Sequence, residues 1–328
     1  MKTFLKFFIG FLLLVLILFT MGPTVETPVI DKPLPELSIA IDELPQWVNK
    51  QNEAFPNIKP GNEAEIIFAD SLPQKTKYAI VYLHGFSGST ADGMPVHKEV
   101  AAALGANIYL PRLYDHGLDT PEGLANYTGE KSLDSAREAL AVGQLLGEKV
   151  ILMGTSTGCT LALALAAQHP DLAALVLYAP NIRINHPLDF VATLPWGLQI
   201  IRQVEGGDYH HVANSIPEKA QYWTMRYRLE AVVHMQKLLE TAMIPTTFAK
   251  VTVPVFSGYY YKDETAQDPT VSVAAMQQMF KELGTPENLK EEKAFPHTGA
   301  HEIASELVSN NHEGVKIATL AFLNRILN

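Results

Sequence analysis

Cysteine is almost absent from this 328-residue sequence. The single cysteine, Cys159, excludes a disulfide within the chain. It lies in an apolar, alanine- and leucine-rich stretch, so we expect a small buried hydrophobic side chain and not a reactive thiol. The adjacent His210 and His211 have no helical His/Glu pairing or cysteine cluster around them. We therefore predict a polar loop there and no metal site.

Basic residues are also fewer than acidic residues. The sequence has 25 Lys and Arg residues against 35 Asp and Glu residues, for a net charge of -10. Lys2 and Lys6 lie in the first 22 residues, so 23 basic residues face 35 acidic residues in the rest. An acidic body without a basic stripe is a poor nucleic-acid binder, and we predict no nucleic-acid partner. The sequence also has no internal repeat and no glycine-rich phosphate loop.

Residues 1–22 form a membrane-directed segment and not part of the fold. Their uncharged stretch, 7–22, would rise about 23 Å as a helix, against a hydrocarbon core of about 30 Å. That length fits a signal peptide or a short anchor. Because no alanine precedes Ala40 and no Ala-x-Ala site follows the stretch, we favour an uncleaved signal-anchor with the body outside the cytoplasm. The alternative is a secreted or periplasmic protein after cleavage.

Residues 23–60 hold seven of the 21 prolines, which predicts an extended spacer with a short docking helix at about 42–53. From residue 61 to 328, apolar strand patterns alternate with helical ones. This alternation predicts a single catalytic domain with a mostly parallel central sheet and helices on both faces. The expected strands are 65–69, 79–83, 107–110, 150–153, 174–178, 253–256 and 290–294.

A long insertion at about 181–250 separates two of these strands, far more than a short crossover needs. It is aromatic and partly helical, and we interpret it as a cap over the carboxyl ends of the strands, where open sheets bind ligands. Trp196, Tyr222 and Trp223 are the cap residues that we expect in a substrate pocket. The alternative is that these helices simply pack on the sheet.

The sequence around Ser156 has the pattern of a catalytic nucleophile. An apolar strand, 150–153, leads into Gly154-Thr-Ser-Thr-Gly158 and then into an Ala/Leu-rich helix. Glycines at minus two and plus two leave room for a sharp strand-to-helix turn that exposes the serine hydroxyl. The free N–H groups at the start of the helix favour negative charge beside it.

A serine hydroxyl becomes a good nucleophile when a histidine takes its proton and a carboxylate orients that histidine. In this layout the acid and the histidine follow later strands, in that order. We predict Asp263 as the acid, with Glu264 and Asp268 as alternatives, and His301 as the base, with His297 as the fallback.

The oxyanion of such a reaction needs two N–H donors. We predict the backbone N–H groups of Phe86, in Tyr82-Leu-His-Gly-Phe86, and of Thr157, directly after the serine. His84 in the same stretch is expected to be structural.

Together these motifs resemble the α/β-hydrolase superfamily, in particular its bacterial carboxylesterase and monoacylglycerol-lipase-like branch. The resemblance covers about residues 60–328 and implies the α/β-hydrolase fold, ester hydrolysis through an acyl-enzyme, and no metal or organic cofactor. Thr157 departs from the Leu, Met or Gln that is commoner at its position. The motifs that carry the resemblance are Tyr82-Leu-His-Gly-Phe86, Tyr114-Asp-His-Gly117, Gly154-Thr-Ser-Thr-Gly158, Lys262-Asp-Glu264 and Gly299-Ala-His301.

We therefore expect a membrane-tethered serine hydrolase that acts on a small-molecule ester. Two alternatives stay open: an amide or peptide hydrolase of the proline-aminopeptidase type with the same triad, and a non-catalytic homologue that binds a small ligand. The sequence leaves the acyl chain length, the alcohol group and the oligomeric state open.

Overall fold

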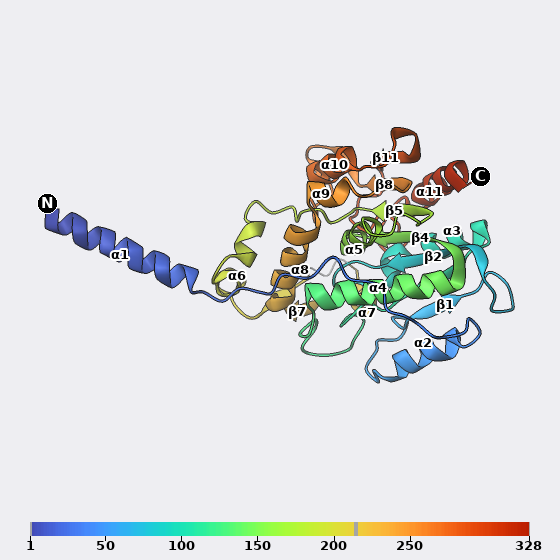
Figure 1. Cartoon of the computed structure of the whole chain (residues 1–328), viewed down its shortest axis with the longest axis horizontal. Helices are drawn as coiled ribbons and strands as arrows, with labels where there is room; N and C mark the ends of the chain where they lie inside the picture. The colour runs from blue at the N-terminus through green and yellow to red at the C-terminus, as the bar shows by residue number, and fades with distance from the viewer. Residues whose placement is uncertain (1, 213–215, 328) are drawn as a thin grey trace.

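A seven-stranded sheet forms the centre of the computed structural model, which describes residues 2–212 and 216–327 (Figure 1). Its strand order is β1-β3-β2-β4-β5-β8-β11, and within it β1 runs antiparallel to β3 while the other neighbours are parallel. The mostly parallel sheet predicted from the sequence is thus confirmed. The strands are β1 (Glu65–Ile67), β2 (Thr76–Leu83), β3 (Asn107–Leu110), β4 (Gly147–Thr155), β5 (Ala174–Tyr178), β8 (Val255–Tyr259) and β11 (Lys290–Ala294).

Helices cover both faces of the sheet, as predicted. Alternate residues of β2 show why: Val81 and Leu83 belong to one buried cluster, and Ile80 and Tyr82 belong to another. The first cluster is closed by α4 (Gly129–Leu146), α5 (Thr157–Ala166) and α8 (Leu229–Ala242). The second is closed by α3 (Val96–Leu104) and α11 (His312–Leu327).

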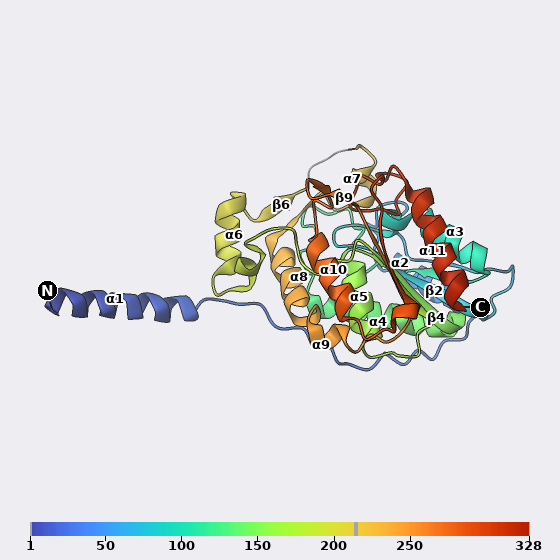
Figure 2. The same cartoon turned by 90° about the horizontal axis from the view of Figure 1, so that it is seen from above.

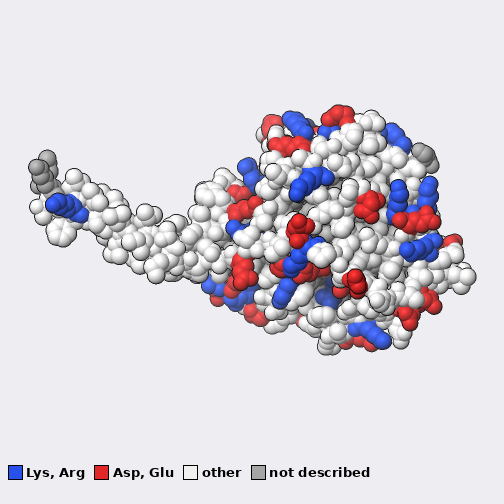
Figure 3. Space-filling view, in the orientation of Figure 1, with Lys and Arg blue, Asp and Glu red and all other residues white. Residues whose placement is uncertain are grey.

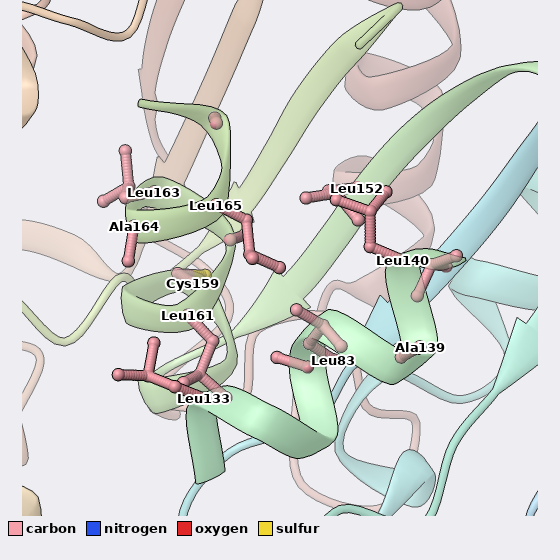
Figure 4. Packing of buried hydrophobic residues seen from close by; sticks show 14 of the residues in the cluster. Leu83, Leu133, Ala139, Leu140, Leu152, Cys159, Leu161, Leu163, Ala164 and Leu165 are labelled. Carbon is pink, nitrogen blue, oxygen red and sulfur yellow. The ribbon is translucent and has the colours of Figure 1, made fainter. Parts of the chain in front are cut away.

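The first cluster is the larger of the two and lies directly under the predicted nucleophile. Figure 4 shows Leu83 of β2 and Leu152 of β4 among Leu133 and Leu140 of α4 and Leu161 of α5. All five are at most 1% exposed. The turn between β4 and α5 is therefore fixed by packing on the strand side and on the helix side.

The segment between β5 and β8 contains the predicted cap. Its elements η2 and α6 pack on each other and on α8, whereas α8 also packs on α4 and α5. The α8 part of the insertion thus belongs to the main core, and η2 and α6 form the outer cap. The elements are η2 (Asp189–Thr193), α6 (Gly197–Glu205), β6 (Tyr209–His211), α7 (Lys219–Tyr222), β7 (Arg226–Arg228), α8 and α9 (Pro245–Phe248).

Three segments lie outside this plan. The N-terminal helix α1 (Lys2–Thr20) projects away from the body on the side of α6 in both views (Figures 1 and 2). Residues 23–40 have no helix or strand, and α2 (Leu44–Glu53) docks through Leu44 and Val48. Between β8 and β11 lie the hairpin β9 (Tyr261–Asp263) and β10 (Ala266–Gln267), and α10 (Val273–Glu282).

Candidate functional site

Ser156 stands at the turn between β4 and α5 in a backbone conformation that most residues avoid. Its φ is 55° and its ψ is -119°, and its side chain is 8% exposed. The Ser156 N–H donates to the carbonyl of Tyr178 (2.9 Å), and its own carbonyl accepts from the N–H groups of Cys159 (3.0 Å) and Asn181 (3.1 Å). Strain at a single residue persists where its surroundings hold it in this way, and such strain clusters at functional sites.

The two glycines around Ser156 are required by sterics. A Cβ atom on Gly158 would lie 1.8 Å from the carbonyl oxygen of Leu83, and one on Gly154 would lie 2.8 Å from the same oxygen. Both glycines therefore let β2 and the β4–α5 turn approach closely. The Gly-x-Ser-x-Gly pattern has the structural context that the sequence predicted.

His301 is paired with a buried carboxylate. Its Nδ1 lies 2.7 Å from Oδ2 of Asp268, and the two residues are 8% and 1% exposed. The other carboxylate oxygen of Asp268 accepts from the N–H groups of Thr270 (2.8 Å) and Val271 (3.1 Å). Burial acts to lower the pKa of His301, but the charge and hydrogen bond of Asp268, with help from Glu302, outweigh it and raise this pKa.

The prediction of Asp263 as the partner of His301 is wrong in this geometry. Asp263 is exposed at the tip of the β9–β10 hairpin, where its Oδ1 accepts from the N–H groups of Thr265 and Ala266. The hairpin carries the chain away and returns it to the sheet at Asp268, whose N–H donates to the carbonyl of Tyr260 (3.1 Å). Asp268, which follows the hairpin, is therefore the partner of His301, and Asp263, which comes first after β8, is not.

The remaining alternatives also lie outside the pair. Glu264 is exposed in the same hairpin and accepts from the hydroxyl of Tyr261 (3.0 Å). His297 is exposed in the loop after β11. Asp268 was open as an alternative from the sequence. The Asp-Pro step at 268–269, which is typical of turns, is a local signal that could have favoured it.

A cavity of about 700 Å³ brings Ser156, His301, Phe86 and Thr157 together. Nε2 of His301, the atom that faces away from Asp268, is buried and has no hydrogen-bond partner among the described residues. Catalytic hydrogen bonds of an unliganded enzyme often close only when substrate binds. Nε2 is thus the one ring atom of His301 that is free to exchange a proton.

Two backbone N–H groups in this cavity are free to bind an oxyanion. Within the described residues, neither the Phe86 N–H nor the Thr157 N–H donates a hydrogen bond to another protein group. Thr157 is the first residue of α5, whose N-terminus favours negative charge. The Phe86 ring is held edge-on by Tyr127 and Tyr227, with centroids 5.1 and 5.2 Å away.

Asp92 was missed by sequence reasoning and lies directly beneath the Phe86 loop. One oxygen accepts from the Gly85 N–H and the other from the Tyr82 hydroxyl, both at 2.6 Å, and the residue is 1% exposed. Burial raises the pKa of Asp92 to about 8, against the opposing effect of these hydrogen bonds. The only local signal, Ser89-Thr-Ala-Asp92, resembles a helix-capping box, which predicts a different partner.

His84 has the structural role expected of it. Its Nε2 accepts from the Leu113 N–H (3.1 Å), so Nδ1 carries the proton and donates to the carbonyl of Gly85 (2.9 Å). Burial holds the pKa of His84 well below its ordinary value, and the ring is neutral. His84 thus ties the Phe86 loop to the loop after β3.

The outcome for the predicted pocket residues is mixed. Trp223 is buried and lines the cavity. Trp196 and Tyr222 are absent from the described lining: Trp196 contacts the end of α1, and Tyr222 lies beside Gly61. Both predictions are wrong because aromatic side chains indicate contact with some surface without indicating which one.

Two further observations bear on cofactor chemistry. Among residues 2–212 and 216–327, no group of three or more His, Cys, Asp or Glu side chains is placed to hold a metal ion. Cys159 is fully buried, burial raises the pKa of its thiol, and Sγ donates to the carbonyl of Gly154 (3.0 Å). The cysteine is a packing residue, as expected.

Comparison with known proteins agrees with this fold. The model of the alpha/beta hydrolase family matches residues 80–306, more than half of the chain. The chain belongs to this family. The match includes Phe86, Ser156, Asp268 and His301, so the whole arrangement described above lies inside the shared domain of this α/β-hydrolase.

One protein that matches part of this chain by sequence is a lipase. A thermostable monoacylglycerol lipase of Bacillus sp. (strain H-257) is 30% identical over 113 residues, 34% of this chain and 43% of the lipase, so the match spans under half of that relative.

Two solved structures share the fold of this α/β-hydrolase. A structure from a study of the metagenome-derived lipolytic enzymes LipS and LipT has a TM-score of 0.65 at 19% identity, covering 82% of this chain and 99% of that one. A thermostable carboxyl esterase from Bacillus coagulans has a TM-score of 0.58 at 14% identity, covering 84% and 97%.

Proposed function

We propose that this α/β-hydrolase cleaves carboxylic esters through an acyl-enzyme on Ser156. The observation that carries the proposal is the Asp268–His301 pair, 2.7 Å apart, in one cavity with Ser156 and two unpaired backbone N–H groups. A nucleophile, a base, an orienting acid and an oxyanion site are the groups that acyl transfer requires.

In the first half of the reaction, Oγ of Ser156 attacks the ester carbonyl carbon while Nε2 of His301 takes the hydroxyl proton. The carbonyl oxygen becomes an oxyanion and accepts hydrogen bonds from the N–H groups of Phe86 and Thr157. Nδ1–H of His301 donates to Asp268, which stabilises the imidazolium. When the tetrahedral intermediate collapses, His301 returns the proton to the leaving alcohol and the acyl group stays on Ser156.

In the second half, water attacks the acyl-enzyme, and His301 takes a proton from this water. Collapse of the second intermediate returns the proton to Oγ of Ser156 and releases the carboxylic acid. The reaction needs the neutral form of His301 at the start of each half.

The cap and α8 together supply an apolar wall that suits the acyl part of an ester. Burying each CH₂ of an acyl chain against it would contribute about 0.8 kcal/mol. Apolar side chains of this wall are Leu188, Val191, Ile200, Ile201, Val204, Val212, Leu229, Val232 and Met235.

We further propose that α1 tethers the enzyme to a membrane. Thr3–Thr20 has a mean hydropathy of 2.5 and no residue buried against the body, so it is long and apolar enough to cross a bilayer. Cleavage of a signal peptide is the alternative, and N-terminal sequencing of the mature protein that began near residue 23 would contradict the tether.

Kinetics on matched substrates test the activity. We expect hydrolysis of nitrophenyl esters, a fall in kcat of about 10⁶-fold in Ser156→Ala, and much slower hydrolysis of aminoacyl anilides. Faster cleavage of anilides than of esters would favour an amide hydrolase. Absence of turnover on every ester of a chain-length series, with the protein folded, would contradict the proposal and favour a binding protein.

A further inference from the structure

The N-terminal helix is fastened to the body by a short connection. α1 ends at Thr20, and Pro28 is already buried against the body. The following residues are held firmly: one guanidinium nitrogen of Arg137, a residue only 2% exposed, donates to the carbonyls of Val29 (2.7 Å) and Ile30 (2.8 Å). Gln168 also donates to the carbonyl of Ile30 (2.8 Å). The chain from Thr20 to Pro28 spans at most about 28 Å, so the body cannot stand far from whatever surrounds α1.

The cap lies at the junction with α1. Nε1 of Trp196 donates to the carbonyl of Leu18 (3.1 Å), and the Trp196 N–H donates to the carbonyl of Pro23 (3.3 Å). A Cβ atom on Gly22 would lie 2.3 Å from the Trp196 ring, so the glycine lets the chain approach the indole. Tryptophan is enriched at the membrane–water interface, where its ring sits at the level of the lipid headgroups.

Exposed apolar side chains lie on η2 and α6, the two cap elements that pack on each other at this junction. We call Leu188, Phe190, Trp196, Ile200 and Val204 the cap apolar patch; their exposed fractions are 57%, 51%, 41%, 39% and 80%. In a soluble protein, clustered exposure of this kind marks an interaction site. Figure 3 shows that the surface of α1 is uncharged except near its outer end, and the exposed side chains of the helix from Phe4 to Phe19 are mostly large and apolar.

The cap apolar patch is also part of the wall of the active-site cavity. Leu188, Ile200 and Val204 line the cavity that holds Ser156 and are also among the exposed side chains of the cap. A surface that covers the patch therefore also lies against this wall of the acyl pocket.

We propose that the cap apolar patch docks on the same bilayer that α1 enters, and that the substrate is an acyl ester dissolved in that bilayer. The inference rests on the proposed ester hydrolysis at Ser156 and on retention of α1. The bilayer is the occupant that the structure favours because α1, the Trp196 contacts and the short connection place the patch beside it. A lipid ester then enters the acyl pocket along apolar surface.

Site-specific fluorescence in vesicles tests the docking. Cys159 is the single cysteine and is fully buried, so an introduced cysteine can be labelled selectively. Phe190→Cys places a label in the cap apolar patch without touching the cavity lining. Leu72→Cys, at a residue 68% exposed, is the control, because it precedes the amino end of β2, opposite the carboxyl end at Leu83.

The full chain, with α1 verified by intact mass, is reconstituted into phosphatidylcholine vesicles that contain nitroxide-labelled lipid. We expect quenching of the label at position 190 and none at position 72. Equal quenching at both positions, or none at either, would overturn the docking. Shielding of the 190 label in detergent that grows with protein concentration would show a second copy on the patch, and would also overturn it.

Substrate presentation tests the consequence for activity. In the double variant Phe190→Glu/Trp196→Glu, we expect turnover of monoacylglycerol in vesicles to fall about tenfold or more, since loss of 1.4 kcal/mol of docking free energy is a factor of ten. Turnover of a water-soluble short-chain nitrophenyl ester should stay unchanged, because neither residue lines the cavity. Leu72→Glu, the matched control, should change neither rate.

The outcomes separate the two proposals. If Ser156→Ala leaves the turnover of both substrates intact, the proposed function fails. If Ser156→Ala abolishes both but the double variant slows neither, or slows both equally, the ester hydrolase stands and the bilayer docking is wrong.

Discussion

The edge of the sheet at the carboxyl ends of its strands and the outer cap differ in what holds their residues in place. At the edge, Asp268 is 1% exposed and each of its oxygens accepts a hydrogen bond, from His301 or from backbone N–H groups. In the cap, Phe190 and Val204 are 51% and 80% exposed. Contacts within the chain therefore account for the edge, whereas the cap face is the one for which we propose a partner outside the chain.

The inserted hairpin β9–β10 shows the same contrast at close range. Asp263 and Asp268 lie five positions apart, yet one is on the exposed hairpin and the other is buried at the sheet edge. Position relative to the sheet, and not distance along the chain from β8, decides which carboxylate can orient His301.

The largest effect in this comparison is expected from the two carboxylates. Asp268→Asn should lower kcat by about 10⁴-fold, because an amide neither stabilises the imidazolium nor enforces the productive tautomer. Asp263→Asn, the matched control, should retain activity close to that of the unmodified protein. The measurement is kcat on a nitrophenyl ester. Equal losses of kcat in the two variants would contradict the different roles given to Asp268 at the sheet edge and Asp263 in the hairpin.

Two glycines give the next test. Gly158→Ala would place a methyl group 1.8 Å from the carbonyl oxygen of Leu83. Overpacking of this kind costs about 1–3 kcal/mol or more in the free energy of unfolding and should displace Ser156. Gly207→Ala in the cap meets no atom within 4 Å and should change the free energy of unfolding little. Urea unfolding monitored by fluorescence compares them, and similar midpoints for both variants would contradict the account.

Removing Asp92 should have a smaller effect, on the loop that carries Phe86. Asp92→Ala leaves the buried Gly85 N–H without its acceptor and the Tyr82 hydroxyl with Thr155 alone, at a cost of about 1–3 kcal/mol in the free energy of unfolding. Asp92→Asn should be milder, because the amide oxygen can accept from the Gly85 N–H while the amide NH₂ donates to the Tyr82 oxygen, whose own proton can go to Thr155. Urea midpoints of the two variants give the comparison, and a milder effect of alanine than of asparagine would count against this role.

Asp92 also predicts a pH dependence of stability. Its pKa is about 8 in the folded protein and about 4 in an unfolded chain. Because the folded value is raised, its contribution is fully present below about pH 4 and is lost as the pH rises to about 8. The urea midpoint of the unmodified protein should fall between about pH 4 and pH 8, and that of Asp92→Asn should fall less. The same dependence of the midpoint on pH in the two proteins would contradict this prediction.

The smallest expected effect is a shift in the pH at which kcat/KM falls on acidification. Because the pKa of His301 is raised, kcat/KM should fall on acidification with an inflection above about 6.5, the ordinary histidine value. In Asp268→Asn, burial acts without the opposing charge, so NMR titration of the His301 ring should give a lower pKa. An unchanged pKa of the His301 ring in Asp268→Asn would show that Asp268 does not raise that pKa.

The fold could be predicted where the signal is local. The strand, the two glycines and the helix that hold Ser156 are contiguous, and the strands of the sheet follow from alternating apolar patterns. His301, Phe86 and Thr157 line the same cavity as Ser156, as their positions after strands suggested, and their catalytic roles stay predictions.

Sequence reasoning failed where a tertiary contact decides the role. The strands β9 and β10 have three and two residues, too few to show a periodic pattern, so the hairpin that displaces Asp263 was invisible. Asp92 acts through Gly85 and Tyr82, contacts that its own local sequence does not specify. Trp196 was assigned to the pocket because an aromatic residue alone does not distinguish a cavity from the end of α1.

Covalent labelling tests the central claim most directly. The folded full-length chain is treated with a fluorophosphonate, and the adduct is located by peptide mass analysis. The account predicts a single adduct on Ser156, formed much more slowly in Asp268→Asn but at an unchanged rate in Asp263→Asn. An adduct on another residue, or labelling that persists undiminished in Ser156→Ala, would contradict it.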